Sequence, residues 1–404
     1  MTFLEFFSML LGFPCWAQLK WGKVTMSENN KIVLFLGSGA TAGSGDTENG
    51  QPVPTDSKFF ENLPKQWEIG YPALNLYRDV VHKETSLYKT WNDLFIYRSL
   101  VCSGIVREKP ETLHRFNDLA NHKWPENYNW RAGHYSFQFR LMNQSLLPDE
   151  YYLAELAIWD LRTLVKEVYG VEKSNGVYKN FLENVNSKFG EICAVVNLNY
   201  DTTFDDADGV QYYYPGDGKS MEGKIPIIRP HGSLKWTSRS QWRLNQGWTG
   251  WSESYDDTPL KETGYKPTGD PMLLDFRQAL IVSPASFKEE VVGNSSMPGL
   301  QNTILRPQWE HLKRAMENYN HWVFVGISFA SGDDHLLWLL KRSFNKSKTK
   351  ISCFIKDSCQ PVQKLKECLG KGVGIAVYKN NAEEIDEFKK CKNFKECQKP
   401  KCDH

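Results

Sequence analysis

The sequence predicts an α/β fold in which long helical stretches join the strands of a mainly parallel sheet. Two observations predict it. Short apolar runs of the length of a buried strand recur along the chain, at 32–36, 193–196, 322–325 and 351–355, separated by long stretches with room for helical crossovers. Glycine or polar residues directly follow most of these runs, which is typical of the carboxyl edge of such a sheet, where ligands bind.

Length and composition narrow the class of protein. The 404 residues can hold a full core together with a second domain or large insertions. Basic and acidic residues number 49 and 48, so no overall charge points to a nucleic-acid partner. Nine irregularly spaced cysteines, with 41% hydrophobic residues and 14 tryptophans, indicate a folded protein with reduced thiols, which predicts a cytoplasmic location.

The first strand, at 32–36, runs directly into Gly37-Ser38-Gly39. Glycines at this point allow a sharp turn and let a phosphate approach backbone N–H groups, although glycine turns also occur for purely steric reasons. A phosphate-binding P-loop is excluded because no lysine follows. Gly37, Gly39 and Ala42 fit the G-x-G-x-x-G/A pattern of dinucleotide sites.

The residues after this turn do not continue as a dehydrogenase would. Residues 43–54 are rich in turn formers, and Asp56, at about the right distance for a ribose-binding acid, lies on no expected strand. Pro52 to Asp56, with Pro54 inside it, forms a rigid loop that can fold over a ligand. From about 61 to 185 the pattern is mostly helical and predicts an inserted helical layer, most clearly at 152–169, where an apolar stripe recurs every three or four residues.

Two further strand ends carry polar candidates. The strand at 193–196 ends in Asn197-Leu198-Asn199-Tyr200-Asp201, and the strand at 225–228 is followed by Arg229-Pro230-His231-Gly232. Histidine is the usual general base near neutral pH, and the neighbouring proline and glycine hold it in a defined place. The alternatives stay open: Asn and Asp also favour turns and helix caps, and a single histidine is often structural.

The second half of the chain adds a tryptophan-rich excursion, further strands and a tail. Residues 234–272 are rich in turn formers and aromatic residues, and we expect a long loop packed on the body of the protein. Strands are expected at 279–282, 322–325 and 351–355, with a helix around 309–319. The tail, 381–404, holds Cys391, Cys397, Cys402 and His404, but without a paired C-x-x-C we expect no metal site.

Four motifs in order resemble the sirtuin-like family, and more closely its bacterial branch found in antiphage defence systems. They are GSGAT at 37–41, NYD at 199–201, PHGS at 230–233, and G-x-S at 326–328 followed by D-x-H-L at 333–336. The match spans most of residues 31–356. The resemblance implies a Rossmann-like, mainly parallel sheet with helices on both faces, over 31–380, interrupted by the helical insertion.

The resemblance also implies an NAD site and the roles of its residues. Gly37, Ser38, Gly39, Ala40 and Thr41 would hold the phosphates, Asn199 and Asp201 the ribose on the nicotinamide side, and His231 would be the base. Ser328 would lie near the adenosine half. Pro54, Asp56, Gly326 and Asp333 complete the expected cofactor-binding set.

The function expected from these motifs is that of an NAD glycohydrolase, the toxic effector of a bacterial antiphage defence system. The first rival is an NAD-dependent protein deacylase. Sirtuin deacylases usually carry cysteine zinc ligands in the second half of the fold, and the lack of any cysteine between Cys193 and Cys353 counts against this rival. The second rival is a non-catalytic nucleotide-binding sensor. Since no regulatory domain is evident, the resemblance implies a homo-oligomer, or a HerA-type ATPase or short Argonaute as partner; we expect neither membrane attachment nor direct nucleic-acid binding.

The first testable prediction concerns the amino-terminal extension, residues 1–30. Phe6 to Ala17 resembles the apolar core of a signal peptide, but Glu5 precedes it, no basic residue does, and it is too short to span a membrane. Met26 resembles a natural start, so we expect Met1 to Thr25 to pack weakly. Deleting these residues should leave the melting temperature nearly unchanged, and a large fall in a thermal unfolding experiment would show that they are structural.

Overall fold

The structure, a computed structural model, describes most of the chain between Lys31 and Lys379. The described residues are 31–42, 45–47, 53–81, 86–105, 118–119, 121–124, 126, 131–144, 149–174, 177–205, 211–216, 223–243, 247–255, 264–267, 273–282, 304–329, 333–355, 360–370 and 372–379. The predictions for the extension at 1–30 and for the tail at 381–404 lie outside these residues.

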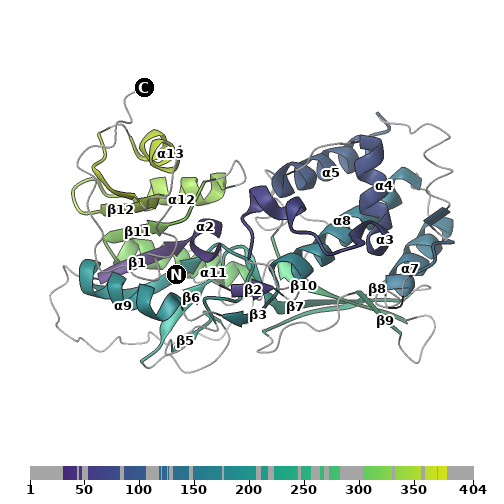
Figure 1. The fold of residues 1–404 in the computed structure, drawn as a ribbon, viewed down its shortest axis with the longest axis horizontal. Helices are drawn as coiled ribbons and strands as arrows, with labels where there is room; N and C mark the ends of the chain where they lie inside the picture. The colour runs from purple at the N-terminus through teal and green to yellow at the C-terminus, as the bar shows by residue number, and fades with distance from the viewer. Residues whose placement is uncertain are drawn as a thin grey trace, which may run out of the picture. The chain divides into compact units, whose positions relative to one another are not determined.

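The centre of the fold is a seven-stranded sheet in which every neighbouring pair of strands is parallel (Figure 1). The strand order is β13-β12-β11-β1-β4-β6-β5. The bounds are β1 Lys31–Leu36, β4 Glu191–Asn197, β5 Tyr212–Tyr213, β6 Ile225–Ile228, β11 His321–Val325, β12 Lys350–Ile355 and β13 Ile375–Lys379. The four strands on which the fold prediction rested thus share one sheet, whereas β13, at its edge, was not predicted.

The sheet is covered by helices on both faces because its strands are apolar on both. Ile32, Leu34 and Leu36 pack in one cluster with helix α9 (Val177–Phe189). Val33 and Phe35 point to the other face, where helices α11 (Leu305–Asn318), α12 (Asp334–Ser343) and α13 (Gln360–Leu369) cover them. Continuous apolar runs are what a strand buried on two faces requires, so the predicted Rossmann-like α/β class is confirmed.

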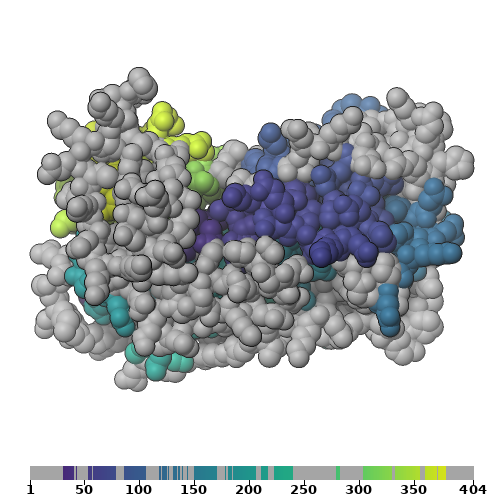
Figure 2. Space-filling view, viewed as in Figure 1, coloured from purple at the N-terminus to yellow at the C-terminus, as the bar shows by residue number. Residues whose placement is uncertain are grey.

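A group of helices with its own core is inserted between β1 and β4, as the sequence indicated. It consists of η2 Asp56–Glu61, α3 Trp67–Gly70, α4 Pro72–Val81, α5 Leu87–Cys102, α7 Arg131–Gln144 and α8 Asp149–Tyr169. The apolar stripe predicted at 152–169 lies on α8 and is fully buried in this core. Figure 1 shows these helices gathered together, and in Figure 2 the residues of η2, α3 and α4 form a continuous purple band on the visible face.

The tryptophan-rich stretch is not a loop, which corrects the expectation from its composition. It forms an antiparallel sheet of order β8-β7-β10-β9, with β7 Gly232–Arg243, β8 Gly247–Tyr255, β9 Gly264–Pro267 and β10 Leu273–Ile281. The strand expected at 279–282 is the end of β10. Two features hide these strands in the sequence. The stretch has many Ser, Thr and Gly residues, and β7 is buried on both faces where it starts, so the alternation of apolar and polar residues that marks a half-buried strand is missing. A two-stranded pair, β2 (Gly45–Thr47) with β3 (Val171–Ser174), completes the fold.

The packing of two core cysteines gives a second prediction. Burial raises the pKa of the Cys193 thiol on β4 to about 11 and that of Cys353 on β12 to about 12. At about pH 8 only roughly a thousandth or less of either thiol is then the reactive thiolate. Alkylation followed by peptide mass mapping should modify Cys102, which is exposed on α5, well before either of them. Equally fast modification of Cys353 in the folded protein would contradict this packing.

Candidate functional site

The order of the strands places the expected ligand-binding crevice at the carboxyl ends of β1 and β11. From β1 the chain moves outward through β4 to β6, and it then returns to the other side of β1 at β11 and continues to β12 and β13. The direction of winding therefore reverses between β1 and β11. In doubly wound α/β sheets, ligands bind outside the carboxyl ends of the strands at this reversal.

Two turns cross in this crevice at unusually short range. The N–H of Gly37 donates to the carbonyl of Val325 at 2.9 Å, and the N–H of Gly39 donates to the carbonyl of Gly326 at 3.0 Å. Gly326 has a φ of +62°, and a Cβ added to it would lie 2.2 Å from the backbone nitrogen of Ala40. The close approach of the two backbones is therefore enough to require these glycines. This is the steric alternative to phosphate binding that the sequence left open.

The same bonds bear on the predicted phosphate site. The N–H of Ala40 donates to Gly37 O at 2.8 Å, so Gly37, Gly39 and Ala40 all donate their N–H groups to backbone carbonyls. The carbonyl of Ala40 accepts from the Tyr178 hydroxyl at 3.2 Å. Ser38 and Thr41 lie in the one-turn helix α2 (Ser38–Thr41). Phosphate binding by this turn stays a prediction.

Asn199 reaches the crevice from the loop after β4. The side-chain oxygen of Asn197 accepts from the Asn199 N–H at 3.1 Å, which turns the chain at the strand end. The Asn199 side chain then donates from Nδ2 to the carbonyl of Gly37 at 3.1 Å, joining this loop to the turn after β1. Among the described residues, none of the hydrogen bonds of Asn199 uses its Oδ1, so this oxygen can accept one.

His231 is held beside the same loop. Its Nδ1 lies 3.2 Å from the carbonyl oxygen of Leu198. Because a carbonyl only accepts hydrogen bonds, this contact assigns the proton to Nδ1 and leaves the lone pair on Nε2. The residue that follows, Gly232, has a φ of +83°, and its added Cβ would lie 2.1 Å from Leu280 O, so the chain after His231 fits against β10 only as glycine.

Asp333, directly before α12, lies near Nε2, the imidazole nitrogen that carries the lone pair. Its Oδ1 lies 3.8 Å from His231 Nε2, and the two side chains are only 14% and 9% exposed. This distance is too long for a hydrogen bond but suits an ion pair once the imidazole is protonated. The ring of Trp309 on α11 lies on another side of His231, with the ring centroids 6.4 Å apart.

Asp201 makes a different contact from the one its motif implied. Its Oδ1 accepts from the backbone N–H of Thr203 at 3.0 Å, and its side chain is 1% exposed. Burial raises the pKa of the Asp201 carboxyl above its usual value, and the neighbouring Arg229 guanidinium partly opposes this shift. The structure thus gives Asp201 a turn-forming role, and its contact with a ribose stays a prediction.

Asp56 and Pro54 lie where the helical group meets the sheet edge. The Tyr169 hydroxyl at the end of α8 donates to Asp56 Oδ1 at 2.6 Å, and burial together with this carboxylate raises the pKa of Tyr169. The Tyr169 ring lies 6.3 Å from the ring of Tyr200, whose hydroxyl donates to Val282 O at 2.5 Å. Pro54 is buried nearby in sequence. Ser328, by contrast, is exposed.

The structure therefore connects several of the predicted residues through shared contacts, among them Gly37, Asn199, His231 and Asp333. It adds three residues that the sequence analysis did not assign, Arg229, Tyr169 and Trp309. Arg229 has a signal that could have been used, since a charged residue directly after a buried strand needs a partner. Trp309 and Tyr169 are ordinary members of amphipathic helices and give no such signal.

The described residues contain no group of three or more His, Cys, Asp or Glu side chains placed to hold a metal ion. None of their helices has both the length and the apolar character needed to cross a membrane.

Comparison with known proteins gives structural neighbours only. No protein-family model and no curated protein matches the chain. A structure described as concerning the mechanism and regulation of Sir2 enzymes matches with 11% identity and a TM-score of 0.34, covering 85% of this chain and 91% of that one. A complex of a Sir2 homologue with NAD matches with 12% identity and a TM-score of 0.28, covering 58% and 71%.

A third neighbour, a Sir2 homologue mutant in complex with ADP-ribose, is 12% identical with a TM-score of 0.25. The match covers 48% of this chain and 64% of that one, which is less than two thirds of its length. Scores this low do not establish a family for the chain.

The crossing of the two turns gives the third prediction. Gly326→Ala adds both a strained φ and a backbone clash, so it should lower the free energy of unfolding by about 2–5 kcal/mol. Urea unfolding measures this loss. Gly370→Ala, at φ +111° with open space around it, isolates the strain, and Gly374→Ala, also in open space and without a positive φ, should change stability by less than about 0.5 kcal/mol. Equal effects at 326 and 374 would contradict the close crossing.

Proposed function

We propose that the chain binds NAD in the crevice between β1 and β11 and hydrolyses the bond between nicotinamide and ribose. One observation carries the proposal: at the reversal point of the sheet, the side chain of Asn199 bonds Gly37 O in the turn after β1, and the imidazole of His231, distant in sequence, is held by the carbonyl of Leu198, the neighbour of Asn199. A dinucleotide is the ligand that doubly wound sheets bind at this place. The ordered motifs noted in the sequence support NAD in particular.

The reaction needs few protein groups. A water molecule forms a bond to the anomeric carbon of the ribose as the bond to the pyridinium nitrogen breaks, and the electrons of the broken bond go to that nitrogen. Nicotinamide therefore leaves as a neutral molecule and needs no general acid. The products are ADP-ribose, nicotinamide and one proton, so the protein must orient the water, exclude other water and accept this proton.

His231 and Asn199 can meet these needs. Nε2 of His231 carries the lone pair, because Nδ1 donates to Leu198 O, and so it can accept the proton of the attacking water. The imidazolium formed in this step gains the carboxylate of Asp333 as its counter-charge at 3.8 Å. The unpaired acceptor of Asn199, Oδ1, can receive a hydrogen bond from the water or from a ribose hydroxyl.

The biological setting that we propose is bacterial antiphage defence, in which depletion of NAD arrests an infected cell. This part rests on the resemblance of the motifs to the defence branch of the sirtuin-like family. A homo-oligomer, a HerA-type ATPase or a short Argonaute would supply the control of such an activity.

The fourth prediction tests the catalytic pair. His231→Ala and Asn199→Ala should each lower nicotinamide release from NAD by about 10²–10⁴-fold, the usual contribution of a general base, while NAD binding survives. Nicotinamide release measured by chromatography, with binding by calorimetry, separates the two effects. The matched control is His321→Ala, since His321 starts β11 at the opposite edge of the sheet, where its Nε2 lies 3.0 Å from the Ser352 hydroxyl.

The rival functions give different results in the same assay. A deacylase would release nicotinamide only when an acyl-lysine peptide is added, and a non-catalytic sensor would bind NAD without releasing nicotinamide. Wild-type turnover in a folded His231→Ala protein would contradict the mechanism. A loss of stability and activity together in both variants would show that these residues are structural.

A further inference from the structure

Arg229 is a completely buried arginine that directly follows β6 and lies two residues before His231. Its side chain is 0% exposed, so it touches neither solvent nor a ligand in the crevice. A buried charge is costly unless it is paired and hydrogen-bonded. The groups that this guanidinium binds therefore indicate its role.

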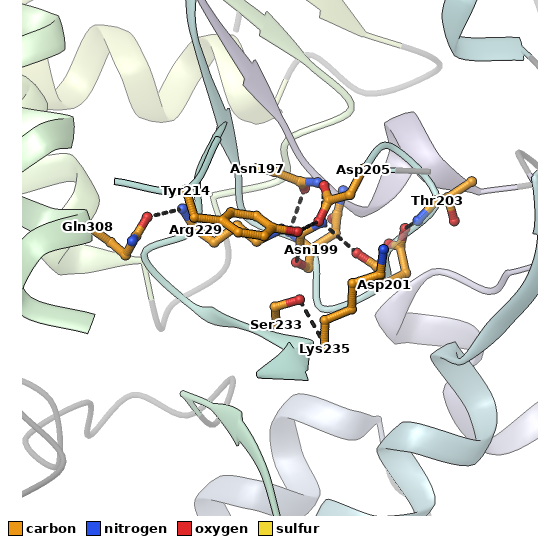
Figure 3. A network of polar contacts seen from close by, with 10 residues as sticks. All are labelled: Asn197, Asn199, Asp201, Thr203, Asp205, Tyr214, Arg229, Ser233, Lys235 and Gln308. Carbon is orange, nitrogen blue, oxygen red and sulfur yellow. Dashed lines mark hydrogen bonds and ion pairs between the residues drawn. The ribbon is translucent and has the colours of Figure 1, made fainter. Parts of the chain in front are cut away.

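The guanidinium binds the loop that carries Asn199 at three points (Figure 3). One terminal nitrogen donates to the carbonyl of Asn199 at 2.7 Å, and the other donates to the carbonyl of Asp201 at 2.8 Å and to Asp205 Oδ1 at 2.6 Å. Asp205 is in turn fixed by the Tyr214 hydroxyl, which donates to its Oδ2 at 2.5 Å. A planar, rigid fork is suited to holding two carbonyls at a set distance.

The backbone of Arg229 is anchored as firmly as its side chain. Its N–H donates to Gln308 Oε1 on α11 at 3.0 Å, and the Gln308 amide donates to Pro215 O at 2.8 Å. The chain leaving Arg229 carries His231, whose Nδ1 bonds to Leu198 O in the same loop. One residue therefore ties the segment before His231 to the loop that holds both Asn199 and the hydrogen-bond acceptor of His231.

We propose that Arg229 is the positioning residue of the site: its guanidinium fixes the 198–201 loop, and thereby the distance between Asn199 and His231 and the tautomer of His231. This inference rests on the proposed function for its catalytic consequence. The geometry favours positioning over stability alone, because two of the three bonds of the guanidinium go to backbone carbonyls of the loop that carries Asn199.

The chain contains a matched control for a purely structural role. Arg131 and Asp160 form another buried ion pair, 2% and 0% exposed, within the helical group. Asp160 also accepts from the Tyr135 hydroxyl at 2.8 Å and from the Leu74 N–H at 3.0 Å, so this pair joins helices α4, α7 and α8. Removing the charges of either pair perturbs one buried Arg–Asp contact, but only one of the two pairs touches the loop of Asn199.

The fifth prediction compares the double variants Arg229→Gln/Asp205→Asn and Arg131→Gln/Asp160→Asn. Both keep polar groups in place and remove the two opposite charges of one buried ion pair together. The first should lower kcat for nicotinamide release by about 10²-fold, the cost of a small misplacement of reacting groups, with KM changed only a few-fold. The second should keep kcat near the wild-type value at a comparable loss of stability in urea unfolding. Arg229→Lys, which keeps the charge but loses the rigid fork, should fall between the wild type and the first variant.

A measurement without turnover keeps the inference separate from the proposed function. Nitrogen-15 NMR of histidine-labelled protein, with the His231 signal assigned by its loss in His231→Gln, should show the Nδ1–H tautomer in the wild type and a mixture in Arg229→Lys. If the wild type does not cleave NAD but shows this change, the proposed function fails and the positioning role stands. If Arg229→Lys keeps both the tautomer and the full kcat of an active wild type, or if the double variant at Arg229 is folded and fully active, the positioning role is wrong.

Discussion

The candidate site depends on the close crossing of two backbone turns at the centre of the sheet edge. The turn after β1 lies so near the turn after β11 that a Cβ on Gly37 would be 2.6 Å from Gly326 O, and one on Gly326 would be 2.2 Å from Ala40 N. Side chains are thus excluded where the two halves of the sheet meet. The carbonyl of Gly37 remains able to accept the Asn199 amide, which links the crossing to the loop after β4.

The chemistry at this edge is arranged mainly by backbone carbonyls. Leu198 O selects the tautomer of His231, Gly37 O orients the Asn199 amide, and the carbonyls of Asn199 and Asp201 are held by Arg229. Backbone positions follow from the sheet, whose strands are fixed by apolar packing on two faces. The positions of Asn199 and His231, the proposed catalytic pair, are therefore determined by backbone atoms of the fold, which is a precise way to place groups for a reaction.

The sequence was sufficient for the parallel sheet, and it is least informative where a pattern has two physical causes. Apolar runs such as Ile32 to Leu36 identify strands because only burial on both faces calls for them. The glycines after β1 fit a phosphate-binding turn, and the close contact of Gly37 and Gly39 with Gly326 is a second, steric cause for the same pattern. The sheet containing β7 was missed because Lys235 and Thr237, polar residues, are as buried as their neighbours Leu234 and Trp236. Long-range partners such as Trp309 for His231 leave no trace in local sequence.

The helical group and the site also share residues, which couples their stability. Tyr200, next to Asn199 in the chain, is buried in the same core as the α8 stripe, together with Leu234 from the start of β7. The backbone binds these two residues to one another, since the Leu234 N–H donates to Tyr200 O at 3.1 Å. The loop of Asn199 is thus held on one side by Arg229 and on the other by the core of the helical group. Loosening of that core would therefore reach Asn199 through its neighbour Tyr200.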